Sequence, residues 1–204
     1  MRDSLAKNNR DTKFWASEYC ILEKNEEITM PSSPVKSINL GLYVARLIHT
    51  NLAVANASAW QWWTAVSLNE DVPLWLQPME GSSGETVKYD GRVVTTKMFW
   101  ATANYSFFVR PGMRRVDVRA VDREVSPLEA ATSLMVSSYT DGAQVVTVFV
   151  NYADTDKSIA LKCDNARKGK MYVTSIDKDL QYVGKQRLDA LSIPARSVVT
   201  VVLD

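Results

Sequence analysis

The sequence predicts an α/β part followed by an all-β part, and three observations support this fold class. Within the first 110 residues, strand-like runs alternate with helical patterns, which is typical of a parallel sheet. After residue 112, short strand-like runs recur with turn residues between them, which is typical of an antiparallel sandwich or barrel. Hydrophobic residues make up 46% and charged residues 23% of the 204 residues, as expected for a folded globular chain.

The first elements read as a strand, a helix and a second strand. Residues 13–22 are apolar and aromatic at their flanks, which predicts a buried strand. Ser33-Pro34 predicts a helix start, because a capping hydroxyl precedes a proline at the first helical position. Apolar residues within 40–48 then recur with helical spacing. The second half of residues 52–66 predicts the next strand, and the crossover has the right length for a βαβ unit.

A long loop and a second helix complete this first part. Residues 67–91 contain two prolines and three glycines and predict a loop. Residues 95–109 predict a helix that is apolar almost all round, and such a helix is buried on more than one side. Pro111-Gly112 ends that helix, so we place a domain boundary near residue 110.

The second part alternates short strands with turns. Strand-like runs cover residues 116–120, 134–139, 144–152, 158–163, 171–176 and 197–203. Residues 145–150 show no polar alternation except at Thr147, which predicts a central strand. Asp154 and Asp156 have the spacing of a partial calcium loop, but the other loop ligands are missing, so a hairpin turn is the favoured interpretation.

Charge and composition argue against several functional classes. Lys plus Arg is 24 and Asp plus Glu is 23, so no overall field indicates nucleic acid or an anionic membrane. No run approaches 18 apolar residues, so no membrane span is expected, and the first residues lack the apolar core of a signal peptide. Two cysteines and the single histidine, His49, argue against a disulfide framework, a metal site and a Ser-His-Asp triad. We therefore expect no cofactor and no metal.

Glu18 and a tryptophan cluster are the candidate chemical groups. A carboxylate inside a buried strand is costly unless it is paired or functional, and Glu18 lies inside the first strand. Trp60, Trp62 and Trp63 end the second strand, and alternation places Trp60 and Trp62 on one face. The C-terminal ends of neighbouring parallel strands lie close together, and a carboxylate beside an aromatic wall suits a glycosidase. The alternative is a buried ion pair beside ordinary aromatic core.

The charges that follow Glu18 allow two interpretations. Glu23, Glu26 and Glu27 lie close to Glu18 in sequence. They form either a solvated loop or a group of charges near a sugar site.

Four short motifs occur in chain order, and together they are spread over nearly the whole sequence. They are residues 15–20 (WASEYC), residues 59–63 (AWQWW), residues 97–112 and residues 193–200. These runs resemble glycoside hydrolase family 30, the family of acid β-glucosidases and endo-β-1,6-galactanases, and most of all its galactanase-like bacterial branch. The resemblance implies that residues 1–110 are the C-terminal portion of a (β/α)8 barrel, with its strands seven and eight and last helix. It implies that residues 111–204 are the antiparallel β-sandwich beside the barrel.

The resemblance also assigns roles to the candidate residues. It implies that Glu18 is the catalytic nucleophile of a retaining enzyme and that Trp60, Trp62 and Trp63 line the sugar subsite. It implies a β-linked oligo- or polysaccharide substrate, such as a β-1,6-galactan or a β-glucoside, and a secreted or periplasmic full-length parent. The sugar, the linkage, endo or exo action and the oligomeric state stay open.

The same resemblance implies that the barrel is incomplete in this chain. A retaining glycosidase needs two carboxyl groups about 5–5.5 Å apart. The family's acid/base glutamate belongs to the fourth strand, whereas this sequence starts just before the seventh, and Asn25-Glu26 cannot substitute in the loop after Glu18. We therefore expect a C-terminal fragment of a larger enzyme that is inactive alone, with an unpaired strand edge beside Glu18. Aromatic surface near Trp15 and Trp60 is expected to be exposed.

Two further hypotheses compete with the enzyme fragment. The chain could instead be a non-catalytic β-sandwich, either a carbohydrate-binding or a structural module, which would require exposed aromatic side chains within residues 113–204. That stretch has five tyrosines and phenylalanines and no tryptophan, so a structural role is favoured over a sugar platform there. The third hypothesis is an unrelated α+β protein with chance similarity.

Overall fold

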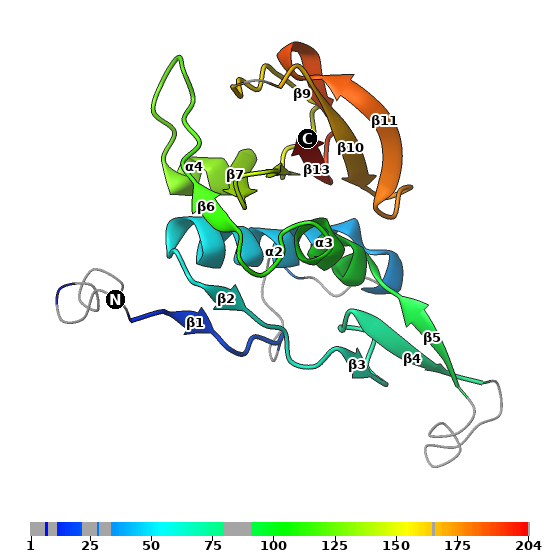
Figure 1. Ribbon diagram of the computed structural model, residues 1–204. Helices are drawn as coiled ribbons and strands as arrows, with labels where there is room; N and C mark the ends of the chain where they lie inside the picture. Colours follow the sequence, from blue (N-terminus) through cyan, green and yellow to red (C-terminus); the bar gives the residue numbers. More distant parts are fainter. Residues whose placement is uncertain are drawn as a thin grey trace.

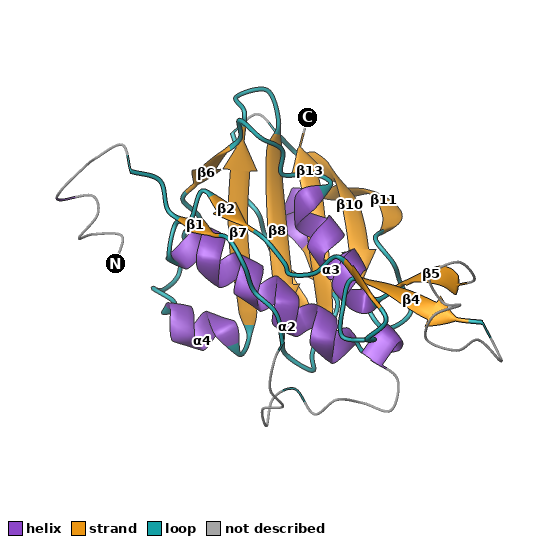
Figure 2. Ribbon diagram, turned by 90° about the horizontal axis from the view of Figure 1, so that it is seen from below, coloured by secondary structure: helices purple, strands orange, loops and turns teal. Residues whose placement is uncertain are grey.

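The computed structural model describes residues 7, 12–21, 28, 34–79, 91–164 and 166–203. Helices α2 and α3 form a middle layer between a six-stranded sheet on one side and two small groups of strands, β1–β2 and β3–β5, on the other (Figure 1; Figure 2). No closed barrel forms within these residues. The candidate charges Glu23, Glu26 and Glu27 lie outside the described residues.

The elements of the first part are short apart from the two helices. In chain order they are β1 (Trp15–Ala16), η1 (Pro34–Lys36), α2 (Ile38–His49), η2 (Thr50–Val54), β2 (Ala59–Trp60), β3 (Val66–Ser67), β4 (Leu74–Pro78), β5 (Gly91–Thr95) and α3 (Lys97–Ser106).

The second part consists mainly of strands. Its elements are β6 (Arg114–Val116), α4 (Pro127–Ala131), β7 (Leu134–Thr140), β8 (Val145–Asn151), β9 (Lys157–Ile159), β10 (Lys168–Thr174), β11 (Gln181–Arg187), η4 (Leu188–Ala190), β12 (Leu191–Ile193) and β13 (Ser197–Leu203).

Both predicted helices form, with boundaries set by their capping side chains. The Ser37 Oγ atom accepts a hydrogen bond from the Leu40 amide, so α2 begins after Ser37. Pro34 starts a separate single turn of 3-10 helix, so the predicted helix start at Ser33-Pro34 is four residues early. The Thr96 hydroxyl accepts from the Phe99 amide and caps α3 in the same way. The chain continues past α2 as the π-helical turn η2 before it reaches β2.

The first strand is shorter and more exposed than predicted. Of the strand predicted over residues 13–22, the described residues 13–21 are regular only at β1, and Trp15 is 58% exposed. Its pairing partner is β2, in parallel register, and these two strands form a two-stranded sheet. Burial of such a strand requires cover on both faces, and the helices cover one face. The predicted exposure near Trp15 is thus confirmed, whereas Trp60 is half-buried.

The predicted loop over residues 67–91 contains regular structure at both ends. Strand β4 pairs in parallel with β3 and antiparallel with β5. The Trp75 indole N–H donates to the Leu68 carbonyl at 3.0 Å and closes the turn between β3 and β4. Residues 80–90 of the predicted loop lie outside the described residues.

The second part forms an antiparallel sheet in the order β11-β10-β13-β8-β7-β6. Strand β8 lies between β13 and β7, so the central position predicted for residues 145–150 is confirmed. Strands β9 and β12 pair with each other as a separate ribbon. The sequence pattern missed β11 and β12, the former because its side chains are polar along most of its length.

Two hydrophobic clusters lie on opposite faces of the six-stranded sheet. One joins α2 and α3 to the sheet through residues such as Leu42, Met98, Val148 and Val198. The other lies between the sheet and the β9–β12 ribbon and includes Phe149, Leu191 and Val201. The first cluster fixes the helices, and the helices in turn position β1 and β2 on their far side.

Candidate functional site

Glu18 and the tryptophan cluster lie on two adjacent parallel segments. The Ser58 amide donates to the Phe14 carbonyl at 2.7 Å, the Gln61 amide to Ala16 at 2.9 Å and the Trp63 amide to Tyr19 at 2.9 Å. The acceptors are spaced by two and then three residues, whereas the donors are spaced by three and then two. The regular register pairs Trp15 with Ala59 and Ala16 with Trp60, and the hydrogen bond from Trp63 to Tyr19 continues the contact beyond it. The structure thus brings residues 18–19 next to Trp63, as the sequence predicted.

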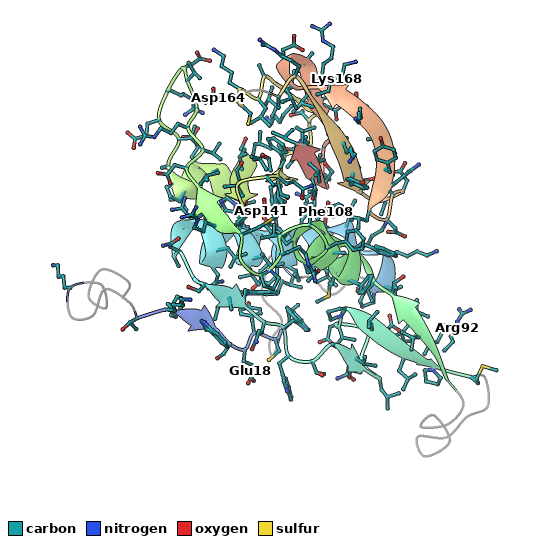
Figure 3. The ribbon with its side chains drawn as sticks, in the orientation of Figure 1. Glu18, Arg92, Phe108, Asp141, Asp164 and Lys168 are labelled. Atoms are coloured by element: carbon teal, nitrogen blue, oxygen red, sulfur yellow. The ribbon has the colours of Figure 1, made fainter. Side chains whose placement is uncertain are left out.

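Glu18 lies on the first segment between the two acceptors Ala16 and Tyr19, just after β1. Glu18 is exposed to solvent. It lies at the side of the β1–β2 layer that faces away from α2 and α3 (Figure 3). The predicted burial of this carboxylate is therefore wrong, because the strand that carries it is covered on one face.

The residue after Glu18 anchors the segment to the helical layer. The Tyr19 and Tyr43 hydroxyls are hydrogen-bonded at 2.6 Å, and Tyr43 belongs to α2. Burial raises the pKa of Tyr19, with a further increase from this hydrogen bond, so the phenol stays protonated at neutral pH. The sequence reasoning did not identify this contact. The sequence indicated this contact only through strand alternation, which places the Glu18 and Tyr19 side chains on opposite faces.

The three candidate tryptophans divide into two environments. Trp60 and Trp62 are half-buried, with ring centroids 6.2 Å apart, and both pack against the core that contains α2. Trp62 also lies 5.8 Å from the ring of Tyr19. Trp63 is 57% exposed. The expectation that Trp60 and Trp62 share a side is consistent with this packing, and Trp63 presents the accessible ring.

Trp60 and Trp62 contain buried polar atoms. Among the residues that the structure describes, neither indole N–H has a hydrogen-bond partner. A buried donor without an acceptor loses about 1–3 kcal/mol relative to a paired one. The packing of the Trp60 and Trp62 rings against the core therefore offsets the cost of their unpaired N–H groups.

A stack of charged and aromatic side chains connects this layer to the large sheet. The Arg46 guanidinium of α2 lies 5.5 Å from the Tyr43 ring and 4.7 Å from the Tyr152 ring. Arg196 lies 4.7 Å from the same Tyr152 ring and donates to the Asn39 side chain at 2.6 Å. Cation–π contacts of this kind stabilise by about 0.5–2 kcal/mol each. Tyr43 thus couples the Tyr19 hydroxyl to the region around Tyr152.

Among the described residues, Glu18 belongs neither to a metal centre nor to the open cavity beside residues 117–125. No group of three or more His, Cys, Asp or Glu side chains with metal-binding geometry occurs among the described residues. An open cavity of about 1330 Å³ lies elsewhere, between the loop over residues 117–125 and the segment over residues 159–164, with His49 among its lining residues. Glu18 and the three tryptophans do not line it. Within the described residues, Glu18 and Trp63 are both exposed to solvent.

Asp154 and Asp156 lie in the connection between β8 and β9, and the predicted hairpin turn is wrong because these two strands belong to different sheets. The Asp156 carboxylate accepts from the Ala195 amide at 2.8 Å, and Asp154 lies 3.8 Å from Arg196. Through these contacts the two carboxylates hold the segment after β8 against the segment before β13. No helix in the described part of the chain is long and apolar enough to cross a membrane.

Comparison with known proteins identifies related sequences and folds. Residues 1–71 match the model of O-glycosyl hydrolase family 30. No curated protein matches the chain. A conserved exported protein from Bacteroides fragilis is 64% identical, with a TM-score of 0.94, over 98% of this chain and 40% of that protein. The chain therefore spans less than half of that relative.

Two more distant structures have the same fold. A family 30 endoxylanase from Clostridium papyrosolvens C71 is 17% identical with a TM-score of 0.69, over 98% of this chain and 44% of that one. A family 30 subfamily 8 xylanase from Clostridium acetobutylicum is 22% identical with a TM-score of 0.67, with the same coverage of both chains. Together with the family model, these matches confirm that the chain is similar to the C-terminal part of glycoside hydrolase family 30 proteins.

Proposed function

We propose that this chain is the nucleophile-bearing part of a retaining β-glycosidase, with Glu18 as the nucleophile. The observation that carries the proposal is the hydrogen bond from the Trp63 amide to the Tyr19 carbonyl at 2.9 Å. It holds an exposed carboxylate beside an exposed indole, Trp63, on adjacent parallel segments. A sugar ring has one apolar face suited to an indole, and its anomeric carbon needs a carboxylate.

In the proposed first step, the Glu18 carboxylate attacks the anomeric carbon and forms a glycosyl ester. The bond from that carbon to the leaving oxygen breaks, and the oxygen departs with the electron pair. An ordinary glycosidic oxygen needs a proton at this moment, from a second carboxyl group about 5–5.5 Å from the first. The family resemblance assigns that group to a strand outside these 204 residues, so we expect the chain alone to be inactive on ordinary glycans.

The architecture and the substrate follow as parts of the same proposal. We assign β1 and β2 to strands seven and eight of a barrel, and β6 to β13 to a β-sandwich, with the division near residue 110. The substrate class is a β-linked glycan such as a β-1,6-galactan or a β-glucoside. Relatives described as xylanases add β-xylans to the panel to be tested. The Bacteroides fragilis relative is described as exported, which supports an exported full-length parent.

A substrate with an activated leaving group tests Glu18 without the missing acid. Dinitrophenolate leaves without protonation, so dinitrophenyl β-galactoside, β-glucoside and β-xyloside require only the nucleophile in the first step. We expect a burst of at most one equivalent of dinitrophenolate per chain. Intact mass spectrometry should show one attached sugar, located on the peptide that contains Glu18.

Glu18→Gln is the test variant, and Glu124→Gln is its matched control. Both carboxylates are exposed, so neither substitution is expected to disturb folding. Glu18→Gln should abolish the burst, whereas Glu124→Gln should leave it unchanged. A burst that persists in Glu18→Gln, or the absence of a burst with all three substrates, would contradict the proposed role of Glu18.

A further inference from the structure

One face of the β10–β11 ribbon collects cations and aromatic rings from both strands. Directly opposed residues of an antiparallel pair point to the same side of a sheet. The pairs are Lys168 with Arg187, Lys170 with Lys185 and, after a register shift, Tyr172 with Tyr182. Tyr172 packs against the cluster that contains the helices, so all six side chains belong to the helix-facing side of the sheet.

The cationic half of this face places like charges directly opposite one another. Opposed like charges destabilise a strand pair, so two such pairs in succession oppose folding of the ribbon. Arg187 is compensated by Asp189, whose carboxylate oxygens lie 3.0 and 2.6 Å from its guanidinium nitrogens. Lys168 and Lys185 are both exposed. The charges of these two exposed lysines attract anions from solvent.

The aromatic half forms a continuous row that begins at the end of α3. The ring centroids of Phe107 and Phe108 are 5.1 Å apart, those of Phe108 and Tyr172 are 4.6 Å apart, and those of Tyr172 and Tyr182 are 5.2 Å apart. The two ends of the row are open, since Phe107 is 68% and Tyr182 is 51% exposed. The row therefore presents apolar ring surface to solvent beside the cations.

The surface extends along β10 away from the helices. Phe108 lies at the level of α3, and Lys168 lies at the far end of β10 (Figure 3). Four residues of strand separate Tyr172 from Lys168, which corresponds to about 13 Å. A ligand that contacts both halves is therefore an extended chain rather than a single small ion.

Contacts of the β10–β11 ribbon with α3 and with β13 hold this surface in place. The Asn104 side-chain amide of α3 donates to the Thr174 hydroxyl at 2.6 Å, at the end of β10. The Lys97 ammonium lies 2.7 Å from the Asp179 carboxylate in the hairpin turn. On the other face, a Cβ atom at Gly169 would lie 2.5 Å from a methyl carbon of Val201, so the ribbon packs closely against β13. The surface is thus preformed.

We propose that this face of β10 and β11 binds a polysaccharide that carries carboxylate groups, that is, a uronate-containing glycan. Lys168 and Lys185 pair with the carboxylates, and the rings of Tyr182, Tyr172 and Phe107 stack on the apolar faces of the sugars. This site is separate from Glu18, and its function does not depend on catalysis.

Lysines on an edge strand have a simpler role that must be separated from binding. β11 ends the sheet among the described strands, and edge lysines prevent pairing with other chains. That role explains Lys185 but not the exposed Tyr182 ring on the same face. The experiment must therefore test the rings and the charges independently.

Affinity electrophoresis of the full 204-residue chain provides the test, with polygalacturonate as the probe in the gel and neutral β-1,4-galactan as the comparison. We expect retardation by polygalacturonate that decreases with added salt, and little retardation by the neutral polymer. Lys168→Gln combined with Lys185→Gln should weaken binding about tenfold, and Tyr182→Ala should do the same. Matched controls on other surfaces, Lys36→Gln and Leu128→Ala, should bind as the unchanged chain does.

Two results would overturn the proposal. One is the absence of retardation by polygalacturonate at low salt. The other is binding that Tyr182→Ala leaves unchanged and that dextran sulfate reproduces equally well, which would indicate attraction by charge alone. Circular dichroism melting of each variant shows that the sheet is intact, so a loss of binding is not mistaken for unfolding.

Discussion

His49 is the single histidine of the chain and its ring is buried at the end of α2. Burial lowers the pKa of His49 from 6.5 to about 4, so the folded chain keeps the ring neutral while the unfolded chain takes up a proton below pH 6.5. Stability from this residue is complete above pH 6.5 and decreases as the pH falls toward 4. We expect a loss of about 2 kcal/mol in the free energy of unfolding between pH 7 and pH 5.

Urea unfolding followed by tryptophan fluorescence measures this loss. His49→Leu should reduce the difference between the two pH values to a small fraction of that in the unchanged chain, because no other histidine titrates in this range. An equal pH dependence in both proteins would show that His49 is already solvated in the folded state.

Asn104 is the second residue whose environment permits a definite prediction. Its side-chain amide donates to the Trp100 carbonyl at 2.9 Å and to the Thr174 hydroxyl, and the Thr200 hydroxyl donates to its carbonyl oxygens. Asn104→Leu keeps the size but leaves the hydroxyls of Thr174 and Thr200 with fewer partners. We expect a loss of about 2–4 kcal/mol in chemical unfolding. Asn69→Leu on the exposed turn after β3 is the control and should change stability little.

Among the strands, those with the clearest hydrophobic pattern were the ones that the sequence predicted. Strands β7, β8 and β13 were predicted because apolar residues run through them and turn residues flank them. Strand β11 was missed because its exposed side is polar and its other side contributes little beyond Val183 to the core. The predicted burial of residues 13–22 was wrong for another reason. An apolar strand pattern shows that a segment needs cover, but not whether the same chain supplies it.

The hairpin between β10 and β11 depends on its contact with α3. The Lys97 side chain is 7% exposed and lies 2.7 Å from Asp179, which is 50% exposed, and it also donates to the Lys178 carbonyl. Asp179→Asn removes the opposite charge while a hydrogen bond stays possible, and Asp179→Ala removes both. We expect losses of about 1 and about 2 kcal/mol respectively, values that allow for the partial exposure of the carboxylate. Hydrogen exchange should increase at β11 before it increases at β8, and a uniform increase would contradict this local role.

For the whole molecule, the position of the candidate site was predictable and its surroundings were not. The order of the strands and the parallel pairing of residues 14–19 with 58–63 follow from sequence motifs, and they place Glu18 beside Trp63. The contact between Tyr19 and Tyr43 depends on how α2 packs between two layers, which local patterns do not specify. The cation–π stack of Arg46, Tyr152 and Arg196 likewise joins residues far apart in the sequence.

The exposed side of the β1–β2 layer leads to a prediction about the complete protein. Trp15 and Trp63 are each more than half exposed, and the Bacteroides fragilis relative contains a further segment that this chain does not cover. If the proposed barrel is correct, a polypeptide with that remaining segment should bind this chain and extend the strand pair. Burial of two large aromatic side chains is favourable by several kcal/mol, on the order of 1.5–3 kcal/mol for each. Tryptophan emission should therefore shift to shorter wavelength on mixing.

Titration of the two polypeptides with fluorescence detection determines the affinity. Trp15→Ala and Trp63→Ala should each weaken association about tenfold or more, because each removes one of the buried contacts. Phe107→Ala removes an aromatic side chain of comparable exposure at the end of α3, and it should leave association unchanged. If the segments associate and Phe107→Ala weakens binding as strongly as the tryptophan variants, the complementary segment covers a different face. In that case β1 and β2 are not the strands that it extends.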